Sequence, residues 1–241
     1  MSPQVFARRA DRLRATPSGP SYQRAWEALD PPGSVLDVGS GAGAACLPLL
    51  PRTTSLTAVD ASAGMLAQLA ERAAAAGVTP RTVAGLWPRA AAQAGQADVV
   101  TCHHVLYNVP DLEPFVTALT ASARRRVVAE VTAAHPLTPL NPLWLRFHGL
   151  RRPDSPTAAD LIAVLEAMGL RPGYQAWSAP RGSDYGSPGE LADVTRRRLC
   201  LPPERTPEVA AALAGTGASV DVPSGATDMI TIWWDGGDAK V

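Results

Sequence analysis

One acidic residue and a run of alternate glycines form the segment with the clearest capacity for chemistry. They are Asp37, Gly39, Gly41 and Gly43, with Ser40 inside the run. The apolar residues of 35–38 predict a strand that ends at the first glycine, and glycine lets the backbone approach a ligand closely. In an open α/β sheet, the turn after the first strand lies at the carboxyl edge, where ligands bind. The segment therefore predicts a ligand-binding loop.

Two classes of nucleotide cofactor fit this loop. Gly39-x-Gly41-x-x-Ala44 satisfies the relaxed dinucleotide fingerprint. Asp37 separates the two classes, because a carboxylate at this place attracts the ammonium and sulfonium of S-adenosylmethionine (SAM) but repels a pyrophosphate. Asp37 thus favours SAM over NAD. The alternative is that Asp37 serves only as a capping or turn carboxylate.

Asp60 is a second acidic residue at the end of an apolar run. It follows Leu56–Val59 and lies 21 residues after Gly39. A carboxylate at this spacing from a glycine loop can accept hydrogen bonds from both ribose hydroxyls of a nucleotide. The alternative is a helix N-cap, supplied by Asp60 or Ser62. The spacing favours the ribose interpretation.

These two segments together resemble the class I SAM-dependent methyltransferases, and within them the small-molecule branch. The resemblance covers roughly residues 34–131 and includes Ala97–Val100 and His103–Asp111. It implies that the glycine loop lies beneath the methionyl part of SAM and that Asp60 holds the ribose. It further implies that Ala61 and Met65 lie beside the adenine and that His103 lies near the sulfonium.

One position departs from the family pattern. Members often carry an aspartate after the glycine that follows the third strand, where it contacts the adenine amino group. Here Gly85 is followed by Leu86 and Trp87. Adenine recognition is therefore expected to depend on packing against Leu86 or Trp87. The alternative for Trp87 is a core aromatic residue.

Base catalysis is assigned to His103. A histidine with a pKa near neutrality can take a proton from an acceptor hydroxyl or amine. His104 is adjacent, and neighbouring side chains on a strand point to opposite faces, so at most one of the two faces the cofactor. The alternative for His103 is a structural histidine. Glu130, at the end of the fifth strand, could pair with a cationic acceptor or bond local backbone.

Acceptor contacts are expected from aromatic residues outside the glycine loop. The candidates are Tyr22, Tyr107, Trp144 and His148, with Trp26 and Phe147 nearby. Loops over a rigid sheet commonly carry specificity, although packing for stability explains the same residues. If Arg151 or Arg152 faces the pocket, an anionic acceptor becomes plausible.

Strands and helices alternate along the first two-thirds of the chain, which indicates an α/β fold with helices on both faces of a mostly parallel sheet. The strands are expected over 35–38, 55–59, 81–84, 97–102, 126–131, 173–178 and 229–234. The helices are expected over 44–50, 62–76, 111–123, 157–168, 190–199 and 207–214. With the resemblance, this gives a Rossmann-like seven-stranded sheet whose last strand is antiparallel.

Residues 1–241 are expected to form a single SAM-dependent methyltransferase domain. Within it, 1–30 is an N-terminal helical segment, and 133–156 and 180–225 are insertions that cover the substrate. A chain of this length can bury a sizeable core.

The 22 basic and 22 acidic residues cancel, so a general attraction to nucleic acid or to an anionic membrane is not expected. The three cysteines form no C-x-x-C pair, and no metal site is expected. No apolar run approaches the length of a membrane span, and the N-terminus lacks the pattern of a secretory signal. A cytoplasmic monomer or homodimer is therefore expected.

The expected activity is transfer of a methyl group from SAM to O, N or C of a small-molecule acceptor, with S-adenosylhomocysteine (SAH) as product. The alternatives are a SAM-binding regulator without catalysis, an RNA or protein methyltransferase, and an NAD-dependent oxidoreductase. Cys102-His103-His104 stands where methyltransferases of flipped bases carry an Asn/Asp-Pro-Pro-aromatic tetrad. This excludes only that subgroup of nucleic-acid enzymes.

Overall fold

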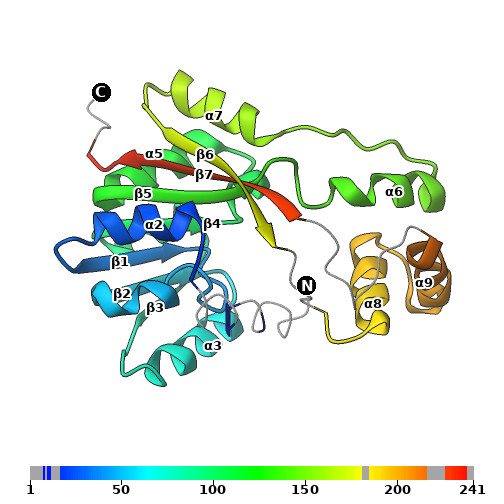
Figure 1. Cartoon of the computed structure of the whole chain (residues 1–241), viewed down its shortest axis with the longest axis horizontal. Helices are drawn as coiled ribbons and strands as arrows, with labels where there is room; N and C mark the ends of the chain where they lie inside the picture. The colour runs from blue at the N-terminus through cyan, green and yellow to red at the C-terminus, as the bar shows by residue number, and fades with distance from the viewer. Residues whose placement is uncertain (1–7, 9, 12–16, 181–184, 216–225, 238–241) are drawn as a thin grey trace.

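The computed structural model describes residues 8, 10–11, 17–180, 185–215 and 226–237. Within them, one seven-stranded sheet has the order β3-β2-β1-β4-β5-β7-β6 (Figure 1). The strands are β1 (Gly33–Val38), β2 (Thr53–Asp60), β3 (Arg81–Ala84), β4 (Ala97–His103), β5 (Ala123–Thr132), β6 (Gly173–Pro180) and β7 (Ala226–Asp235). Strands β1 to β5 pair in parallel, and β7 is antiparallel to both β5 and β6. The predicted fold class is confirmed.

The central strands are buried on both faces because helices cover each side. Val99 and Val100 of β4 and Val127 and Val128 of β5 are fully buried, although they are consecutive and point to opposite faces. The strand order reverses between β1 and β4, so the carboxyl ends of these two neighbours open the crevice where such sheets bind ligands.

The helices divide between two hydrophobic cores. On one face, α5 (Leu112–Ser122) and α7 (Ala158–Ala167) contribute buried residues such as Leu119 and Leu165. On the other face, α2 (Pro20–Ala28) and α3 (Ala63–Ala74) contribute Ala25 and Leu69, and short α4 (Ala91–Ala94) lies with the first core. Helices on both faces of the sheet are therefore confirmed.

Local capping signals define several helix boundaries. The Ser62 side chain accepts a hydrogen bond from the Met65 backbone N–H, which starts α3. Thr157 and Asp160 form a complete capping box at the start of α7. Both features agree with the helix starts expected from the sequence.

The helix expected over 44–50 is wrong. Residues 42–46 form turns, and a 3-10 helix follows over Leu47–Arg52. Pro48 and Pro51 lack a backbone N–H, and a proline ring clashes with the preceding turn of an α-helix, so a regular helix cannot form here.

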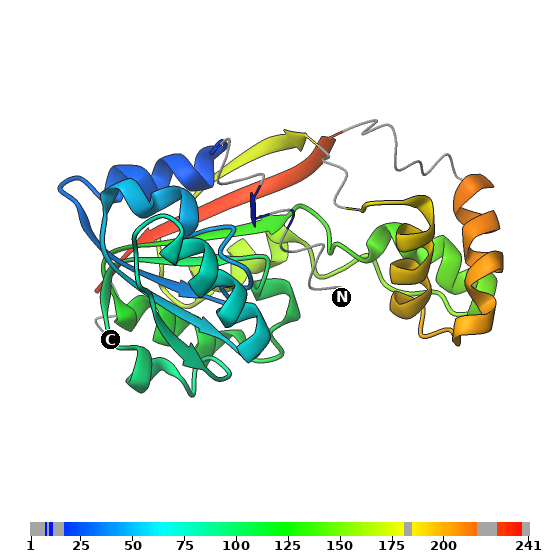
Figure 2. The same cartoon turned by 90° about the horizontal axis from the view of Figure 1, so that it is seen from below.

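A lobe lies beside the sheet rather than on either face (Figures 1 and 2). We call it the side lobe. It consists of α6 (Asn141–His148), α8 (Pro188–Arg198), α9 (Thr206–Gly215) and the 3-10 turns Thr138–Leu140 and Pro203–Arg205. Its own hydrophobic cluster includes Leu143, Ala192, Leu199 and Val209. In the described part of the chain, no helix is both long and apolar enough to cross a membrane.

Candidate functional site

The glycine loop follows β1 and has a conformation that requires glycine. Gly39, Gly41 and Gly43 have φ angles of 71°, 51° and 95°. The backbone N–H groups of Gly39 and Ser40 both donate to Val59 O, at 2.8 and 3.0 Å. A Cβ on Gly39 would collide with the Val105 side chain, and a Cβ on Gly43 would lie 2.7 Å from Leu47 Cγ. The loop is therefore fixed against β2 and the start of the next helical turn.

Asp37 lies in the strand directly before this loop and is only 1% exposed. Its Oδ1 accepts a hydrogen bond from Thr101 Oγ1 at 2.8 Å. Its Oδ2 and the hydroxyl of Ser40 are buried and have no hydrogen-bond partner among the described residues. Burial raises the pKa of Asp37, while nearby His103 and the Thr101 bond act in the opposite direction. Unsatisfied buried polar atoms are costly, and two at one loop indicate a place for ligand groups.

Asp60 connects the glycine loop to the start of α3. Its Oδ2 accepts from Gly41 N at 2.9 Å and its Oδ1 from Ser62 N at 2.8 Å. Ser62, rather than Asp60, is the N-cap of α3. Each carboxylate oxygen can accept more than one hydrogen bond, so both keep capacity for ribose hydroxyls.

The residues expected beside the adenine have different surroundings. Met65 Cε lies 3.5 Å from the position of a Cβ built on Gly41, and Ala61 is exposed. Leu86 is 64% exposed. Trp87 instead packs edge-on against Phe115 and donates from Nε1 to Phe115 O at 3.1 Å. Trp87 thus packs as a core aromatic residue, which was the alternative to adenine binding. Leu86 remains accessible for packing against the adenine.

The two histidines at the end of β4 differ in their backbone conformation. β4 ends at His103, whose charge acts on both Asp37 and Glu130. His104 has a φ of 60°, which is the left-handed region. The alternation expected along a strand therefore does not apply to this pair. Strained φ angles at non-glycine residues tend to cluster at functional sites.

His104 is held by Glu130 at the end of β5. His104 Nε2 lies 3.2 Å from Glu130 Oε1, and His104 N donates to Glu130 O at 2.7 Å. Burial alone would raise the pKa of Glu130. The hydrogen bond from His104, the charges of both histidines and the Ser21 hydroxyl outweigh it and lower the pKa to about 2. Glu130 is thus a carboxylate at neutral pH, positioned to orient the His104 ring.

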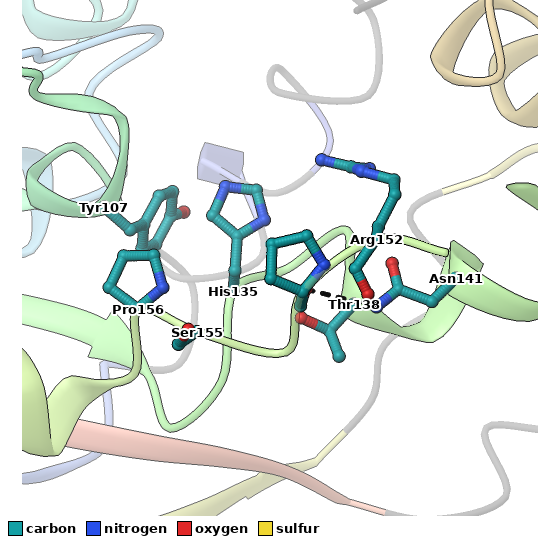
Figure 3. A pocket seen from close by; sticks show the side chains of 8 residues that line it. Tyr107, His135, Thr138, Asn141, Arg152, Ser155 and Pro156 are labelled. Carbon is teal, nitrogen blue, oxygen red and sulfur yellow. Dashed lines mark hydrogen bonds between the residues drawn. The ribbon is translucent and has the colours of Figure 1, made fainter. Parts of the chain in front are cut away.

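A cavity of about 210 Å³ lies beyond His104, at the carboxyl ends of β4 and β5. Its wall includes Tyr107, His135, Thr138, Asn141, Arg152 and Ser155 (Figure 3). The Tyr107 ring links the two regions, because its centroid lies 6.3 Å from that of His104 and 5.3 Å from that of His135. We call this the polar cavity.

A smaller, mainly apolar cavity of about 100 Å³ adjoins the polar cavity. Its wall includes Leu106, Val109, Leu112, Val131, Leu161 and Val164. The two cavities share Tyr107, His135 and Pro156. We call the smaller one the apolar cavity.

Of the four expected acceptor contacts, Tyr107 lines both cavities, and the other three line neither of them. Tyr22 packs on Trp26 of α2, with ring centroids 5.4 Å apart. Trp144 and His148 of α6 pack together at 4.7 Å, and His148 Nε2 lies 2.7 Å from Leu199 O. This pairing joins α6 to α8 inside the side lobe, so both residues contribute to packing there.

Sequence reasoning did not identify His135 as a site residue. It lies in a proline-rich connection with no local pattern. The feature that could have identified His135 is its position shortly after the fifth strand, because the carboxyl ends of parallel strands share the edge of the sheet where ligands bind. The sequence does not distinguish Arg152 from its neighbour Arg151, and the structure places Arg152, not Arg151, on the cavity wall.

The described residues contain no cluster of three or more His, Cys, Asp or Glu side chains that could hold a metal ion. The site therefore consists of a glycine loop with two acids, a His–Glu pair and two adjoining cavities. All of these lie at or next to the carboxyl ends of the parallel strands β1, β2, β4 and β5.

Residues 35–126 match the family model of a methyltransferase domain. No curated protein matches the sequence. Among solved structures, the YcgJ protein of Bacillus subtilis is similar, with 19% identity, a TM-score of 0.56, and coverage of 89% of this chain and 98% of that chain. Magnesium protoporphyrin IX methyltransferase from Synechocystis PCC 6803, solved with bound SAH, is 16% identical with a TM-score of 0.55. The match covers 95% of this chain and 83% of that chain. Precorrin 8w decarboxylase from Methanobacterium thermoautotrophicum is 12% identical with a TM-score of 0.51, and the match covers 90% of this chain and 91% of that chain.

These comparisons agree with the fold. The chain has the class I methyltransferase fold, and the matched segment 35–126 contains the glycine loop, Asp60 and β4. The resemblance to the class I methyltransferases is confirmed for the fold and for the matched segment, and the assignment to the small-molecule branch stays a prediction. The decarboxylase among the similar structures illustrates that one fold serves more than one reaction, so the reaction must be argued from the site.

Proposed function

We propose that this chain, built around a methyltransferase domain, binds SAM and transfers its methyl group to a small-molecule acceptor. The observation that carries the proposal is the buried Asp37 Oδ2, which has no partner among the described residues and lies below a loop of three positive-φ glycines. A dinucleotide would bring a pyrophosphate to this carboxylate, whereas SAM brings an ammonium and a sulfonium.

The residues present fit SAM. The glycine backbone at Gly39, Gly41 and Gly43 lets the methionyl part approach closely, and Asp37 offers an acceptor for its ammonium. Asp60 keeps lone pairs for the ribose hydroxyls, and Leu86 and Met65 offer apolar surface for the adenine. The similar Synechocystis methyltransferase was crystallised with SAH, which supports the same class of cofactor here.

When bound, SAM supplies a methyl group already activated by its sulfonium. The protein's main contribution is then to place the acceptor atom in line with that methyl group and to exclude water, since proximity can supply much of the acceleration. The two cavities beyond His104 supply such a position. They lie at the same edge of the sheet as the glycine loop, next to the ends of β4 and β5.

We assign the proton-accepting role to His104 rather than to His103, which the sequence favoured. His104 is bonded to the ionised Glu130, and its neighbour Tyr107 lines both cavities. A carboxylate that orients an imidazole and stabilises its protonated form is a recurrent arrangement in base catalysis. The charge of His103 acts on Asp37 as well as on Glu130, so His103 contributes to the charge balance beneath the cofactor.

The side lobe is proposed to cover the acceptor. Its helix α6 begins at Asn141, which lines the polar cavity, and the connection 149–157 returns along the same wall. This arrangement retains the expectation of one domain with 133–156 as substrate cover. In the second expected insertion, α8 and α9 pack against α6 through the side-lobe cluster.

Calorimetry with SAM, SAH and NAD tests the cofactor assignment. We expect the two SAM-type ligands to bind and NAD not to bind. At about 100 times its Kd, a bound ligand also adds about 2.7 kcal/mol to the free energy of unfolding, which thermal unfolding detects. Asp60→Ala should weaken SAH binding while the protein stays folded. Binding of NAD alone, or of none of the three, would overturn the proposal.

A further inference from the structure

We propose that the polar cavity binds a carboxylate group of the acceptor, and that the apolar cavity takes its hydrocarbon part. The acceptor is thus a small amphipathic carboxylic acid. This inference rests on the proposed methyl transfer for its biological meaning, but the anion site can be tested without any turnover.

Arg152 supplies the positive charge. Its guanidinium lies over the Trp144 ring, 5.2 Å from the ring centroid, and forms no ion pair with a carboxylate of the described residues. Arg124, by contrast, is already paired, with its Nε 3.2 Å from Asp98 Oδ1. Arginine has a planar fork of donors that matches a carboxylate, and stacking on an aromatic face holds that fork in place.

The backbone around Arg152 is fixed by Asn141. Asn141 Nδ2 lies within hydrogen-bond distance of Arg152 O and Pro153 O, both at 3.3 Å, and of Asp154 Oδ1 at 2.8 Å. The first residue of α6 therefore ties down the segment that carries the guanidinium. The charge is positioned by the fold rather than left on a free surface loop.

His135 adds a neutral donor to the same wall. The Leu137 backbone N–H donates to His135 Nδ1 at 3.1 Å, so Nδ1 is an acceptor and the ring proton lies on Nε2. Burial and the charge of Arg152 hold the pKa of His135 below its usual value, which keeps the ring neutral at pH 7. In Figure 3 the His135 ring lies between the Tyr107 ring and the Arg152 side chain.

The acids closest to this wall are already engaged. Asp154 accepts the Asn141 amide at 2.8 Å. Asp160, at the edge of the apolar cavity, accepts from Thr157 N at 2.7 Å and from its hydroxyl at 2.8 Å. Among the described residues, no Asp or Glu lines the polar cavity. The wall thus presents a cation and hydrogen-bond donors with no competing carboxylate, which is the chemistry of an anion site.

The apolar cavity defines the other half of the ligand. Leu106, Val131 and Leu161 line it, and Tyr107, His135 and Pro156 separate it from the polar cavity. A ligand that fills both cavities must carry an anionic group at one end and hydrocarbon at the other. A fully polar acid such as a sugar phosphate would leave the apolar wall unmatched.

Calorimetry on the full chain, both alone and with SAH added, tests the inference, using matched pairs of probes. The pairs are 3-phenylpropionate with 3-phenylpropionamide, and hexanoate with hexanamide. We expect at least one carboxylate to bind about 10-fold more tightly than its amide, as a charged hydrogen bond to Arg152 predicts. Arg152→Gln should remove that preference. Arg151→Gln is the matched control, because Arg151 is exposed and outside the cavity wall, and it should keep the preference.

Three results would overturn the inference: no carboxylate binds, the amides bind as tightly as the carboxylates, or Arg152→Gln keeps the full preference. SAH binding is measured separately and should be equal in Arg152→Gln and the wild type. If SAH binds and the carboxylate preference is absent, the inference alone is wrong. If the Arg152-dependent preference is present and SAH does not bind, the anion site stands and the proposed methyl transfer is wrong.

Discussion

His104 Nε2 and Glu130 Oε1 lie 3.2 Å apart, and they come from the carboxyl ends of two adjacent parallel strands. The contact is short because His104 leaves β4 with a φ of 60°, which turns its ring toward β5. Its backbone N–H also donates to Glu130 O at 2.7 Å. The pair is thus fixed twice, by main chain and by side chain.

Glu130→Gln should lower the free energy of unfolding at pH 7 and make that free energy less dependent on pH in the acid range. The pKa of Glu130 is lowered to about 2 in the fold, from an ordinary value of 4.5. A lowered carboxyl pKa stabilises the fold above the unfolded value, and that contribution is lost as the pH falls from 4.5 through about 2. Its size is about 3 kcal/mol. Urea unfolding at pH 7 and at pH 3 measures it.

The exposed Glu113 at the start of α5 provides the control for that measurement. Glu113→Gln should leave the free energy of unfolding at pH 7 nearly unchanged, within about 0.5 kcal/mol. If Glu130→Gln behaves in the same way at both pH values, the His104–Glu130 contact contributes no net stability.

Asp37→Asn should stabilise the free protein and weaken SAM binding. Burial raises the pKa of Asp37, so the fold favours its neutral form and its charge costs stability at neutral pH. When a carboxyl pKa is higher in the folded state than in the unfolded state, its stabilising contribution is present at low pH. That contribution is lost as the pH rises through the folded-state pKa. The amide should therefore add about 1 kcal/mol at pH 7. It cannot pair with the ammonium of SAM, so SAH affinity should fall about 10-fold or more.

Thermal unfolding and calorimetry on Asp37→Asn separate the two effects. Loss of stability together with unchanged SAH affinity would assign Asp37 a purely structural role through its bond with Thr101. That was the alternative considered from the sequence alone.

Asp60→Asn and Ser62→Ala separate cofactor binding from helix capping. Asp60 Oδ2 holds Gly41 N, and Ser62 Oγ holds Met65 N. Ser62→Ala should lower stability by about 1 kcal/mol and leave SAH affinity unchanged. Asp60→Asn should lower SAH affinity about 10-fold or more, because it weakens the bonds to ribose and releases the glycine loop. Equal SAH affinities in the two variants would contradict the ribose assignment.

Local patterns predicted much of this fold. The third strand has the bounds read from the sequence, Arg81–Ala84, and the Thr157–Asp160 capping box starts α7. Strands, glycine turns and caps depend on residues a few positions apart, which sequence patterns record. The helix expected over 44–50 was wrong because Pro48 and Pro51 outweigh its alanine and leucine content.

The acceptor side could not be read in the same way. The polar cavity joins His135 to Arg152 across a connection that contains α6, and no periodicity relates them. The His104–Glu130 contact depends on the register of β4 against β5, in which His103 pairs with Glu130. A register between parallel strands is fixed by the crossover helices, so it emerges only in the assembled sheet.

Gly39→Ala tests whether the glycine loop needs its close approach to Val105. A Cβ at this position would collide with the Val105 side chain, and the φ of 71° adds strain. Gly77 has a φ of 78°, and a Cβ added there would meet no atom within 4 Å. Gly77→Ala therefore carries the backbone strain alone, about 1 kcal/mol. Gly39→Ala should cost more than this control and also weaken SAH binding.

The collision with Val105 can be separated from the backbone strain by a double variant. Val105→Ala should restore part of both losses caused by Gly39→Ala, because it removes the atoms that collide. Urea unfolding and SAH calorimetry on the wild type, the two single variants and the double variant measure this coupling. If the losses in Gly39→Ala and Val105→Ala simply add, the loop does not depend on this contact, and glycine is required there for its φ angle alone.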